Sequence, residues 1–326
     1  MDNKKTICAV IVTFNRKESL VMCLEALSRQ TYHMDAVYVI DNASTDGTQD
    51  FLKGKGYIRE DGAGIHYVRM HENTGGAGGF SEGMKRGYED GYDFLWLMDD
   101  DGEPDNNCLE KLLETYYKTS ANFVGALVVS KDDENELSFN LYDFKKRKSN
   151  FKQIDLAEYE KDGYVELAGS PFNGILVARE LMKSIGFPKK EMFFLGDEFE
   201  YFLRAARAGH RIVTSTSAIL RHPKIRSTLE SVIFGRAYVI YFNNKLRDYC
   251  FFRNNAYIFN HYKIKSPGKI GASPGELLKM FIKYSWFFLI NRKLDVKGLW
   301  FFTSASIDGL RENFGKHMKY LQSARR

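Results

Sequence analysis

The stretch FLWLMDDDGEPD, residues 94–105, places an apolar run directly in front of three consecutive aspartates. Its first five residues are typical of a strand buried in a parallel sheet. The aspartates would then lie at the carboxyl end of the strand, where open α/β sheets bind their ligands. Close carboxylates do not all ionise unless cations or strong donors compensate them. We therefore expect a positive partner, with a metal ion first, at Asp99, Asp100 and Asp101.

A structural explanation of the same aspartates stays open at this point. They also suit a solvated acidic turn, and Asp101 or Asp105 also suits the N-cap of the helical segment that follows. The apolar strand before them is the feature that favours the metal site.

The apolar runs alternate with amphipathic segments along the first 130 residues. Strand-like runs lie at 7–15, 36–42, 64–73, 94–100 and 122–130, and helical segments lie at 16–30, 44–54, 78–91 and 105–120. This alternation predicts a mostly parallel sheet with crossover helices. The polar stretch 131–163 is predicted to form a β-hairpin or other segments outside the core. The alternation of strands and helices resumes from about residue 170.

The net charge differs between the first and the last part of the chain. The 326 residues carry a net charge of +5, but from Arg226 onward there are 18 Lys and Arg and only 6 Asp and Glu, a net of +12, against −7 before it. Segments 231–262 and 274–293 read as long aromatic-rich helices. We expect a catalytic domain over 1–225, with a nucleotide half to about 130 and an acceptor half from about 131, and a basic helical region over 226–326.

The cysteines and the first residues of the chain indicate the cellular compartment of the protein. The four cysteines show no metal-ligand spacing and no compact disulfide framework, so we expect free thiols. The first apolar run is too short for a signal peptide or a membrane span. The sequence therefore predicts a cytoplasmic protein.

Polar residues stand where each of the first four predicted strands ends. Each alone is explained as a turn or cap residue, but together at one sheet edge they favour a nucleotide cleft. These residues are Thr13, Asn15, Asp41, Asn42, Asn73 and Asp99 to Asp101.

A glycine run, NTGGAGGFSEGM at 73–84, follows the third strand and opens a helix. Backbone amides near Gly75 and Gly76 can approach a diphosphate closely, because glycine has no side chain. The run is not a dinucleotide fingerprint, since Ser81 stands at the third glycine position, and no GxxxxGK[ST] motif occurs. A dehydrogenase and a phosphate-loop NTPase are therefore disfavoured.

The segment GDEFEYFLRAARAGH, 196–210, predicts a helix from Asp197 to a C′ glycine at Gly209. Asp197 with Glu200 resembles an acidic capping box, which leaves Glu198 as the free carboxylate of the first turn. A helix N-terminus favours the ionised form that a general base needs. The structural alternative is that Glu198 only complements the helix dipole.

Taken together, these segments resemble glycosyltransferase family 2, the inverting enzymes with a GT-A fold. The resemblance covers about residues 6–262 and is closest to the galactofuranosyl- and rhamnosyltransferase-like branch. It rests on VIVTFNR, DNASTDGT, ENTGGAGGFSEGM, LMDDD, FNGILV, GDEFEYFLRAARAG and an aromatic segment with Tyr249, Arg253, Asn254 and Tyr257.

The resemblance implies roles for individual residues. Asp99 and Asp101 match the metal-binding positions for Mn²⁺ or Mg²⁺, and His222 matches a histidine that completes this site in some relatives. Asp100 lies near the ribose or the metal. Glu198 matches the base, although many members have Asp there, so Asp197 stays an alternative. The nucleotide side is matched by Thr13, Asn15, Arg16, Asp41, Asn42, Asn73, Gly75 and Gly76.

The implied activity is metal-dependent, inverting sugar transfer from a nucleotide sugar to a lipid-linked or growing cell-surface glycan. UDP-galactofuranose is the expected donor, with dTDP-rhamnose or another hexose donor as alternatives, and a catalytically inactive nucleotide-sugar-binding protein as the non-enzyme alternative. No nucleic-acid partner is expected, because no recognition motif accompanies the basic tail. A homo-oligomer stays open.

The basic tail suggests a further partner. An aromatic stripe beside cations suits a helix lying on an anionic membrane, which would make the protein peripheral at the inner face of the cytoplasmic membrane. The alternative is that the stripe packs against the catalytic domain or a second subunit. The stripe comprises Phe281, Tyr284, Phe288 and Leu289, with Lys279, Lys283, Arg292 and Lys293 beside it.

Overall fold

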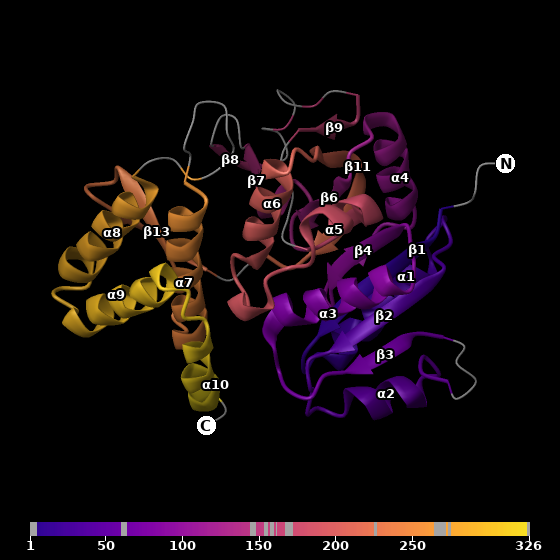
Figure 1. The fold of residues 1–326 in the computed structure, drawn as a ribbon, viewed down its shortest axis with the longest axis horizontal. Helices are drawn as coiled ribbons and strands as arrows, with labels where there is room; N and C mark the ends of the chain where they lie inside the picture. Colours follow the sequence, from indigo (N-terminus) through magenta and orange to yellow (C-terminus); the bar gives the residue numbers. More distant parts are fainter. Residues whose placement is uncertain are drawn as a thin grey trace. The chain divides into compact units, whose positions relative to one another are not determined.

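The computed structural model describes residues 5–59, 64–143, 148–152, 156, 160, 162–166, 172–224, 227–263, 272 and 275–324. The chain forms two compact units (Figure 1). The N-terminal unit comprises residues 1–190 with 204–225, and the C-terminal unit comprises 191–203 with 226–326. The boundary runs through helix α6 (Asp197–Arg207). The change in composition predicts a division at residue 225, and these limits of the catalytic domain stay a prediction.

The N-terminal unit begins with four parallel strands in the order β3-β2-β1-β4. The strands are β1 (Ile7–Thr13), β2 (Ala36–Asp41), β3 (His66–Arg69) and β4 (Phe94–Asp99). Three crossover helices connect them: α1 (Lys17–Ser28), α2 (Thr48–Gly54) and α3 (Gly75–Glu89). The α/β fold with a mostly parallel sheet is confirmed.

Beyond β4 the sheet becomes mixed. Strand β10 (Ile175–Ala178) lies antiparallel between β4 and β6 (Phe123–Ser130), and β11 (Ile212–His222) runs parallel to β6. The predicted hairpin is present as β7 (Glu136–Asp143) and β8 (Lys148–Lys152). The remaining elements are β5 (Glu103–Pro104), α4 (Cys108–Thr119), β9 (Tyr164–Val165), α5 (Arg179–Ile185) and η2 (Lys190–Met192).

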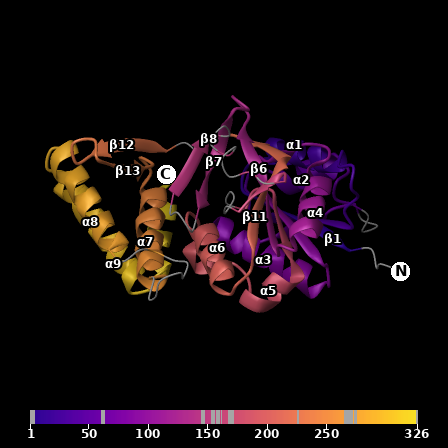
Figure 2. The ribbon, with the colours of Figure 1, turned by 90° about the horizontal axis from the view of Figure 1, so that it is seen from above.

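Helices cover both faces of the parallel strands (Figure 2). On one face, Ile11 and Trp96 share a core with residues from α1 and α4. On the other face α3 lies against the strands, and a Cβ atom on Gly83 would stand 2.3 Å from a methyl carbon of Val10. Part of the glycine run is therefore required by the close approach of α3 to the sheet. All four cysteines are free and buried, as expected.

The C-terminal unit differs from the long helix predicted over 231–262. Residues 228–241 form an antiparallel hairpin of β12 (Thr228–Val232) and β13 (Ala237–Tyr241). Ile233, Phe234 and Gly235 have positive φ angles of 54°, 55° and 82°, which form the turn and cannot continue a helix. Helix α7 (Lys245–His261) begins only after Asn244, whose side chain accepts a hydrogen bond from the Arg247 amide.

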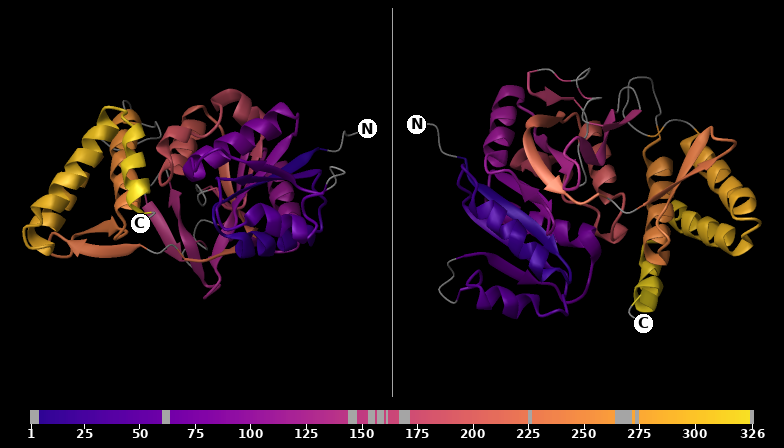
Figure 3. Two further views of the ribbon diagram at one scale, coloured as in Figure 1. Left: turned by 90° about the horizontal axis from the view of Figure 1, so that it is seen from below. Right: turned by 180° about the vertical axis from the view of Figure 1, so that it is seen from behind.

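Three more segments complete this unit. They are α8 (Glu276–Trp286), which continues into a π-helical turn (Phe287–Asn291), α9 (Val296–Leu310) and, after a short 3₁₀ turn (Gly315–His317), α10 (Met318–Ala324). Figure 3 shows α8 beside the hairpin, and the Tyr284 hydroxyl bonds to both backbone groups of Ile240 in β13.

The prediction that the aromatic stripe lies on the surface and faces a membrane is wrong. Tyr284 and Phe288 are buried in the core of the C-terminal unit, where they pack with Phe252 and Phe302. Helical periodicity identified the apolar face correctly, but α7 and α9 cover it. The stripe therefore stabilises the unit itself.

The tight contact between α3 and the sheet gives a stability prediction. Gly83→Ala should lower the free energy of unfolding by about 1–3 kcal/mol, because the added methyl group overpacks a buried contact. The matched control is Gly76→Ala in the same helix, where a Cβ meets nothing within 4 Å. The control should be neutral or stabilise by up to about 1 kcal/mol. Urea unfolding measures both, and equal midpoints would contradict the packing argument.

Candidate active site

The carboxyl ends of β1, β2 and β4 meet at one edge of the sheet, as the sequence predicted. In the strand register Thr13 pairs with Asp41, and Val12 pairs with Asp99. The backbone N–H of Asn42 also donates to the Thr13 carbonyl at 2.9 Å. This register brings the acidic cluster, defined as Asp99, Asp100 and Asp101, beside the polar ends of the neighbouring strands.

Asp99 is held by Asn173, a residue that the sequence analysis did not single out. The Asn173 amide nitrogen donates to Asp99 Oδ2 at 2.8 Å, and its Oδ1 accepts from the Asp99 backbone amide at 3.0 Å. Asn173 is fully buried just before β10. The motif FNGILV contained this residue, but nothing in its pattern indicated that β10 would insert beside β4.

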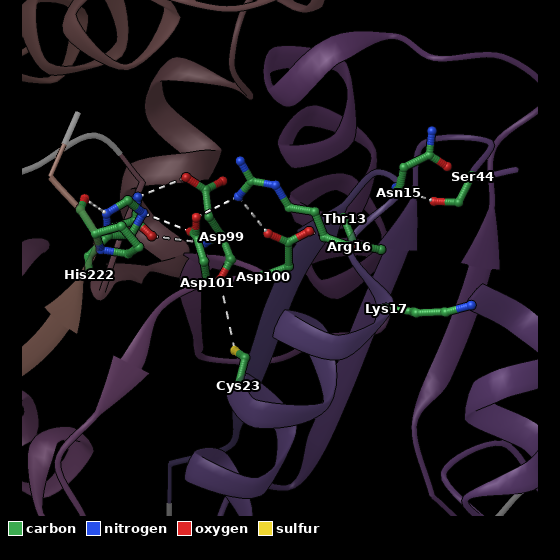
Figure 4. Close-up of polar contacts among 12 residues, drawn as sticks. Thr13, Asn15, Arg16, Lys17, Cys23, Ser44, Asp99, Asp100, Asp101 and His222 are labelled. Atoms are coloured by element: carbon green, nitrogen blue, oxygen red, sulfur yellow. Dashed lines mark hydrogen bonds and ion pairs between the residues drawn. The ribbon is translucent and has the colours of Figure 1, made fainter. Parts of the chain in front are cut away.

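Asp100 is compensated by groups from the end of β1. Thr13 donates its hydroxyl to Asp100 Oδ2 at 2.7 Å, and Arg16 Nη1 lies 3.3 Å from Oδ1. The same Arg16 nitrogen lies 2.5 Å from Asp101 Oδ2. Arg16 is thus the nearest counter-ion to two carboxylates, as Figure 4 shows.

Asp101 faces His222, the last residue of β11. Asp101 Oδ1 and His222 Nε2 lie 2.8 Å apart, yet both atoms are buried and neither has a hydrogen-bond partner of suitable geometry among the described residues. The other ring nitrogen, Nδ1, donates to the Pro223 carbonyl at 2.6 Å. Phe139 packs on the imidazole ring at 4.8 Å between centroids.

The three carboxyl groups of the cluster differ in pKa. Burial, followed by the charge of Asp101, raises the pKa of Asp99 to about 7, and burial raises the pKa of Asp100 to about 6 despite Arg16 and Thr13. Burial also opposes ionisation of Asp101, but His222 and Arg16 outweigh it and lower this pKa to about 2. In the absence of another cation the cluster therefore does not favour three negative charges at neutral pH.

The donor set fits a divalent cation. One ligand atom each from Asp99, Asp101 and His222 lies within 4.8 Å of the others. Carboxylate oxygens with one imidazole nitrogen suit Mn²⁺ or Mg²⁺. The bond from His222 Nδ1 to a carbonyl leaves Nε2 directed to the cluster, which is the usual support of a ligating histidine. The two buried atoms without hydrogen bonds therefore have a chemical explanation.

The remaining nucleotide-side candidates line the same edge through bonds of their own. Asp41 is buried and accepts from the Ser44 amide, Tyr67 and Arg69. Asn42 joins the end of β2 to the start of α3 by donating to the Gly75 carbonyl at 2.9 Å. Further bonds join Asn15 to Thr45 and Asn73 to the Gly75 amide. A nucleotide role for these residues stays a prediction.

Asp197 and Glu198 open helix α6 in the C-terminal unit. The predicted capping box is wrong: the Gly196 carbonyl accepts the Glu200 amide at 2.9 Å, which makes Gly196 the N-cap. Glu198 Oε2 accepts from the Gly196 amide at 3.2 Å, and Glu200 Oε1 accepts from Tyr262. The glycine takes the non-helical entry position, with φ at 107°, so Asp197 begins the helix instead of capping it.

Comparison with known proteins assigns the family. The chain is 31% identical over 320 residues to the galactofuranosyltransferase GlfT1 of Mycobacterium tuberculosis, covering 96% of this chain and 98% of the relative. This chain belongs to glycosyltransferase family 2. The model of glycosyl transferase family 2 matches residues 8–169, and the GlfT1 of Mycolicibacterium smegmatis is 29% identical over 317 residues, covering 96% and 99% of the two chains.

Solved structures show the same fold at low sequence identity. The Staphylococcus aureus TarS residues 1–349 in complex with UDP-GlcNAc align with a TM-score of 0.59 at 13% identity, covering 95% of this chain and 82% of TarS. The Pyrobaculum calidifontis mannosyltransferase PcManGT with GDP-Man and Mn²⁺ aligns at 0.54 and 15% identity, covering 93% and 74%. Together with the sheet topology, these neighbours confirm the GT-A fold of this family 2 glycosyltransferase.

The donor set gives a prediction about metal binding. Asp101→Asn should remove measurable Mn²⁺ binding in calorimetric titrations with UDP present, because it removes a charged ligand. Asn173→Ala should weaken binding by about tenfold, as expected for a residue that orients a ligand. The control Asp50→Asn changes an exposed aspartate of α2 and should leave binding unchanged. Equal affinities for all three variants would contradict the assignment.

Proposed function

We propose that this glycosyltransferase moves galactofuranose from UDP-galactofuranose to a growing or lipid-linked glycan. The observation that carries the proposal is the identity to galactofuranosyltransferases over nearly the whole of both chains. The cluster of Asp99, Asp101 and His222 supports an active enzyme over an inactive binding protein, because one ligand atom from each of the three residues lies within 4.8 Å of the others.

The reaction is proposed as a single displacement with inversion. Glu198 accepts the proton of the acceptor hydroxyl, whose oxygen forms the new bond to the anomeric carbon. The bond from that carbon to the diphosphate oxygen breaks, and UDP leaves with the electron pair. A divalent cation held by Asp99, Asp101 and His222 would supply a Lewis acid for the charge of the diphosphate.

Glu198 is favoured over Asp197 as the base by its surroundings. Asp197 is buried, whereas Glu198 is partly exposed. The Gly196 amide donates a hydrogen bond to the Glu198 carboxylate, which orders the side chain at the first turn of the helix. Support for the donor-side roles of Thr13, Arg16 and Asp100 comes from their mutual bonds beside the metal ligands.

A direct test compares donors and bases. With Mn²⁺ present, UDP-galactofuranose should support transfer and dTDP-rhamnose should not, and the opposite result would select the rhamnosyltransferase alternative. Glu198→Gln should reduce transfer on the order of a hundredfold or more while UDP affinity is retained. Asp197→Asn is the matched comparison, and a larger loss from it would make Asp197 the base. Product anomeric configuration, determined by NMR, tests inversion.

Peripheral attachment to an anionic membrane is also proposed, through a surface other than the stripe. No helix in the described ranges is long and apolar enough to span a bilayer. The turn before α9 and its first turns expose Leu294, Val296 and Trp300, the last at 72%. Lys293 and Lys297 stand among them, exposed and without ion-pair partners in the described part of the chain. Exposed apolar groups with cations suit a membrane interface.

The membrane proposal is tested by co-sedimentation with vesicles. Binding should require phosphatidylserine or phosphatidylglycerol, weaken with salt, and fall in the variant K293E/K297E and in Trp300→Ser. Tyr117→Ser is the control, because Tyr117 is an equally large exposed aromatic residue in α4. Binding that survives both tail variants would contradict this surface, and self-association that they abolish would make it an oligomer interface.

A further inference from the structure

The pair Arg253 and Asn254 in α7 belongs to the aromatic motif that no proposed chemical step uses. Both side chains are completely buried. Burying a guanidinium and a carboxamide is costly unless every donor finds a partner. Their partners therefore indicate what the pair does.

Asn254 binds one short loop three times. The two hydrogens of its amide nitrogen are shared among the carbonyls of Met192, Phe194 and Leu195, at 3.0, 3.1 and 2.9 Å from the nitrogen. These residues lead directly to Gly196 and the first turn of α6. A single side chain from α7 thus collects the carbonyl groups of the loop 192–195.

Arg253 fixes both the loop and the orientation of Asn254. Its Nη2 donates to the Met192 carbonyl at 2.6 Å, and its Nε donates to Asn254 Oδ1 at 2.9 Å. Because Oδ1 accepts this bond, the amide nitrogen of Asn254 must face the loop. Nη1 donates to the Phe314 carbonyl at 2.8 Å, which joins the guanidinium to the segment after α9.

The loop has a backbone conformation that needs such support. Phe193 and Leu195 have φ angles of 67° and 65°, which is the left-handed region that bulky residues avoid. Gly196 has φ at 107°, and a Cβ atom there would lie 3.4 Å from the Asn254 Cβ. The hydrogen bonds from α7 compensate for the strain and select one conformation of the loop.

The loop conformation determines where α6 begins. The Gly196 carbonyl starts the helix, and its amide binds the Glu198 carboxylate. In the same first turn Glu200 accepts a hydrogen bond from Tyr262, the C-cap residue of α7. Contacts from α7 therefore hold the chain on both sides of Glu198.

We propose that Arg253 and Asn254 are positioning residues that fix the loop 192–195 and thereby the direction of the Glu198 carboxylate. The proposal rests on the proposed role of Glu198 as the base. Both side chains are completely buried, so they act through the loop and not as surface groups. They act by keeping the first turn of α6 in one orientation, so that the carboxylate need not be reoriented during each turnover.

A purely structural role of Arg253 and Asn254 would give a different experimental result. If the pair only stabilised the C-terminal unit, its loss would reduce the folded fraction, and the surviving molecules would keep their normal turnover. If it positions Glu198, folded molecules should bind UDP and Mn²⁺ normally and turn over slowly.

The first experiment compares neighbouring asparagines. Asn254→Ala should raise amide hydrogen exchange at 193–198 by about tenfold or more and lower kcat by roughly a hundredfold, as expected for a misplaced catalytic group. UDP affinity with Mn²⁺ should stay within about twofold of the unmodified protein, because ligands that remain in place bind independently of the base. Asn255→Ala is the matched control, since among the described residues Asn255 donates only within α7, to the Phe251 carbonyl at 2.8 Å.

A second variant keeps the test decisive if Asn254→Ala does not fold. Arg253→Lys keeps the charge, but one ammonium cannot reproduce the planar set of donors. It should raise exchange at 193–198 and lower kcat less severely. Unchanged exchange in a folded variant of either residue would overturn the proposal.

A double-mutant cycle separates this proposal from the assignment of the base. In the Glu198→Gln background, Asn254→Ala should cause little further loss of kcat, because it acts through Glu198. Full additivity would refute the positioning role. If Glu198→Gln retains normal transfer, the base assignment fails, while hydrogen exchange still tells whether the pair fixes the loop.

Discussion

The concentration of negative charge at the end of β4 is the constraint around which the N-terminal unit is organised. Burial disfavours ionisation of Asp99 and Asp100 and raises the pKa of both carboxyl groups. Each carboxylate is therefore met by a group from a different element: Asn173 before β10, Arg16 after β1 and His222 at the end of β11. The sheet order places these three chain segments around one point. The residues proposed to hold a cation thus depend on the same strand order that forms the sheet.

The two compact units use buried polar groups in different ways. In the acidic cluster the buried atoms Asp101 Oδ1 and His222 Nε2 lie 2.8 Å apart without a hydrogen bond of suitable geometry among the described residues, which is compatible with a site for a cation. Around Arg253 the three guanidinium nitrogens all donate, and Asn254 uses both ends of its amide. A buried polar group without a hydrogen bond can bind a ligand. One whose hydrogen bonds are all made instead holds the chain in one conformation. This contrast distinguishes a binding role from a positioning role.

The sequence allowed prediction of those features that depend on short-range pattern. Apolar runs located β1, β2 and β4, and parallel strands necessarily bring Thr13, Asp41 and Asp99 to one edge. Asn173 was missed because its contact with Asp99 depends on the insertion of an antiparallel strand, which no periodicity reports. The membrane stripe failed for a related reason: a helical pattern identifies the apolar face of Tyr284 and Phe288, but only tertiary structure shows what covers it.

The start of α6 shows why a motif can identify a functional residue while its local geometry is misread. A sequence with Asp197 and Glu200 three residues apart suggests a capping box, but Gly196 takes the cap because the preceding loop enters with positive φ angles. Those angles are stabilised by Asn254, which lies 59 positions after Leu195 in the printed sequence. Glutamate at 198 then has one methylene more than the usual aspartate, which allows its carboxylate to turn back to the Gly196 amide. This bond orders the side chain, so the longer residue is compatible with a base held at its own helix terminus.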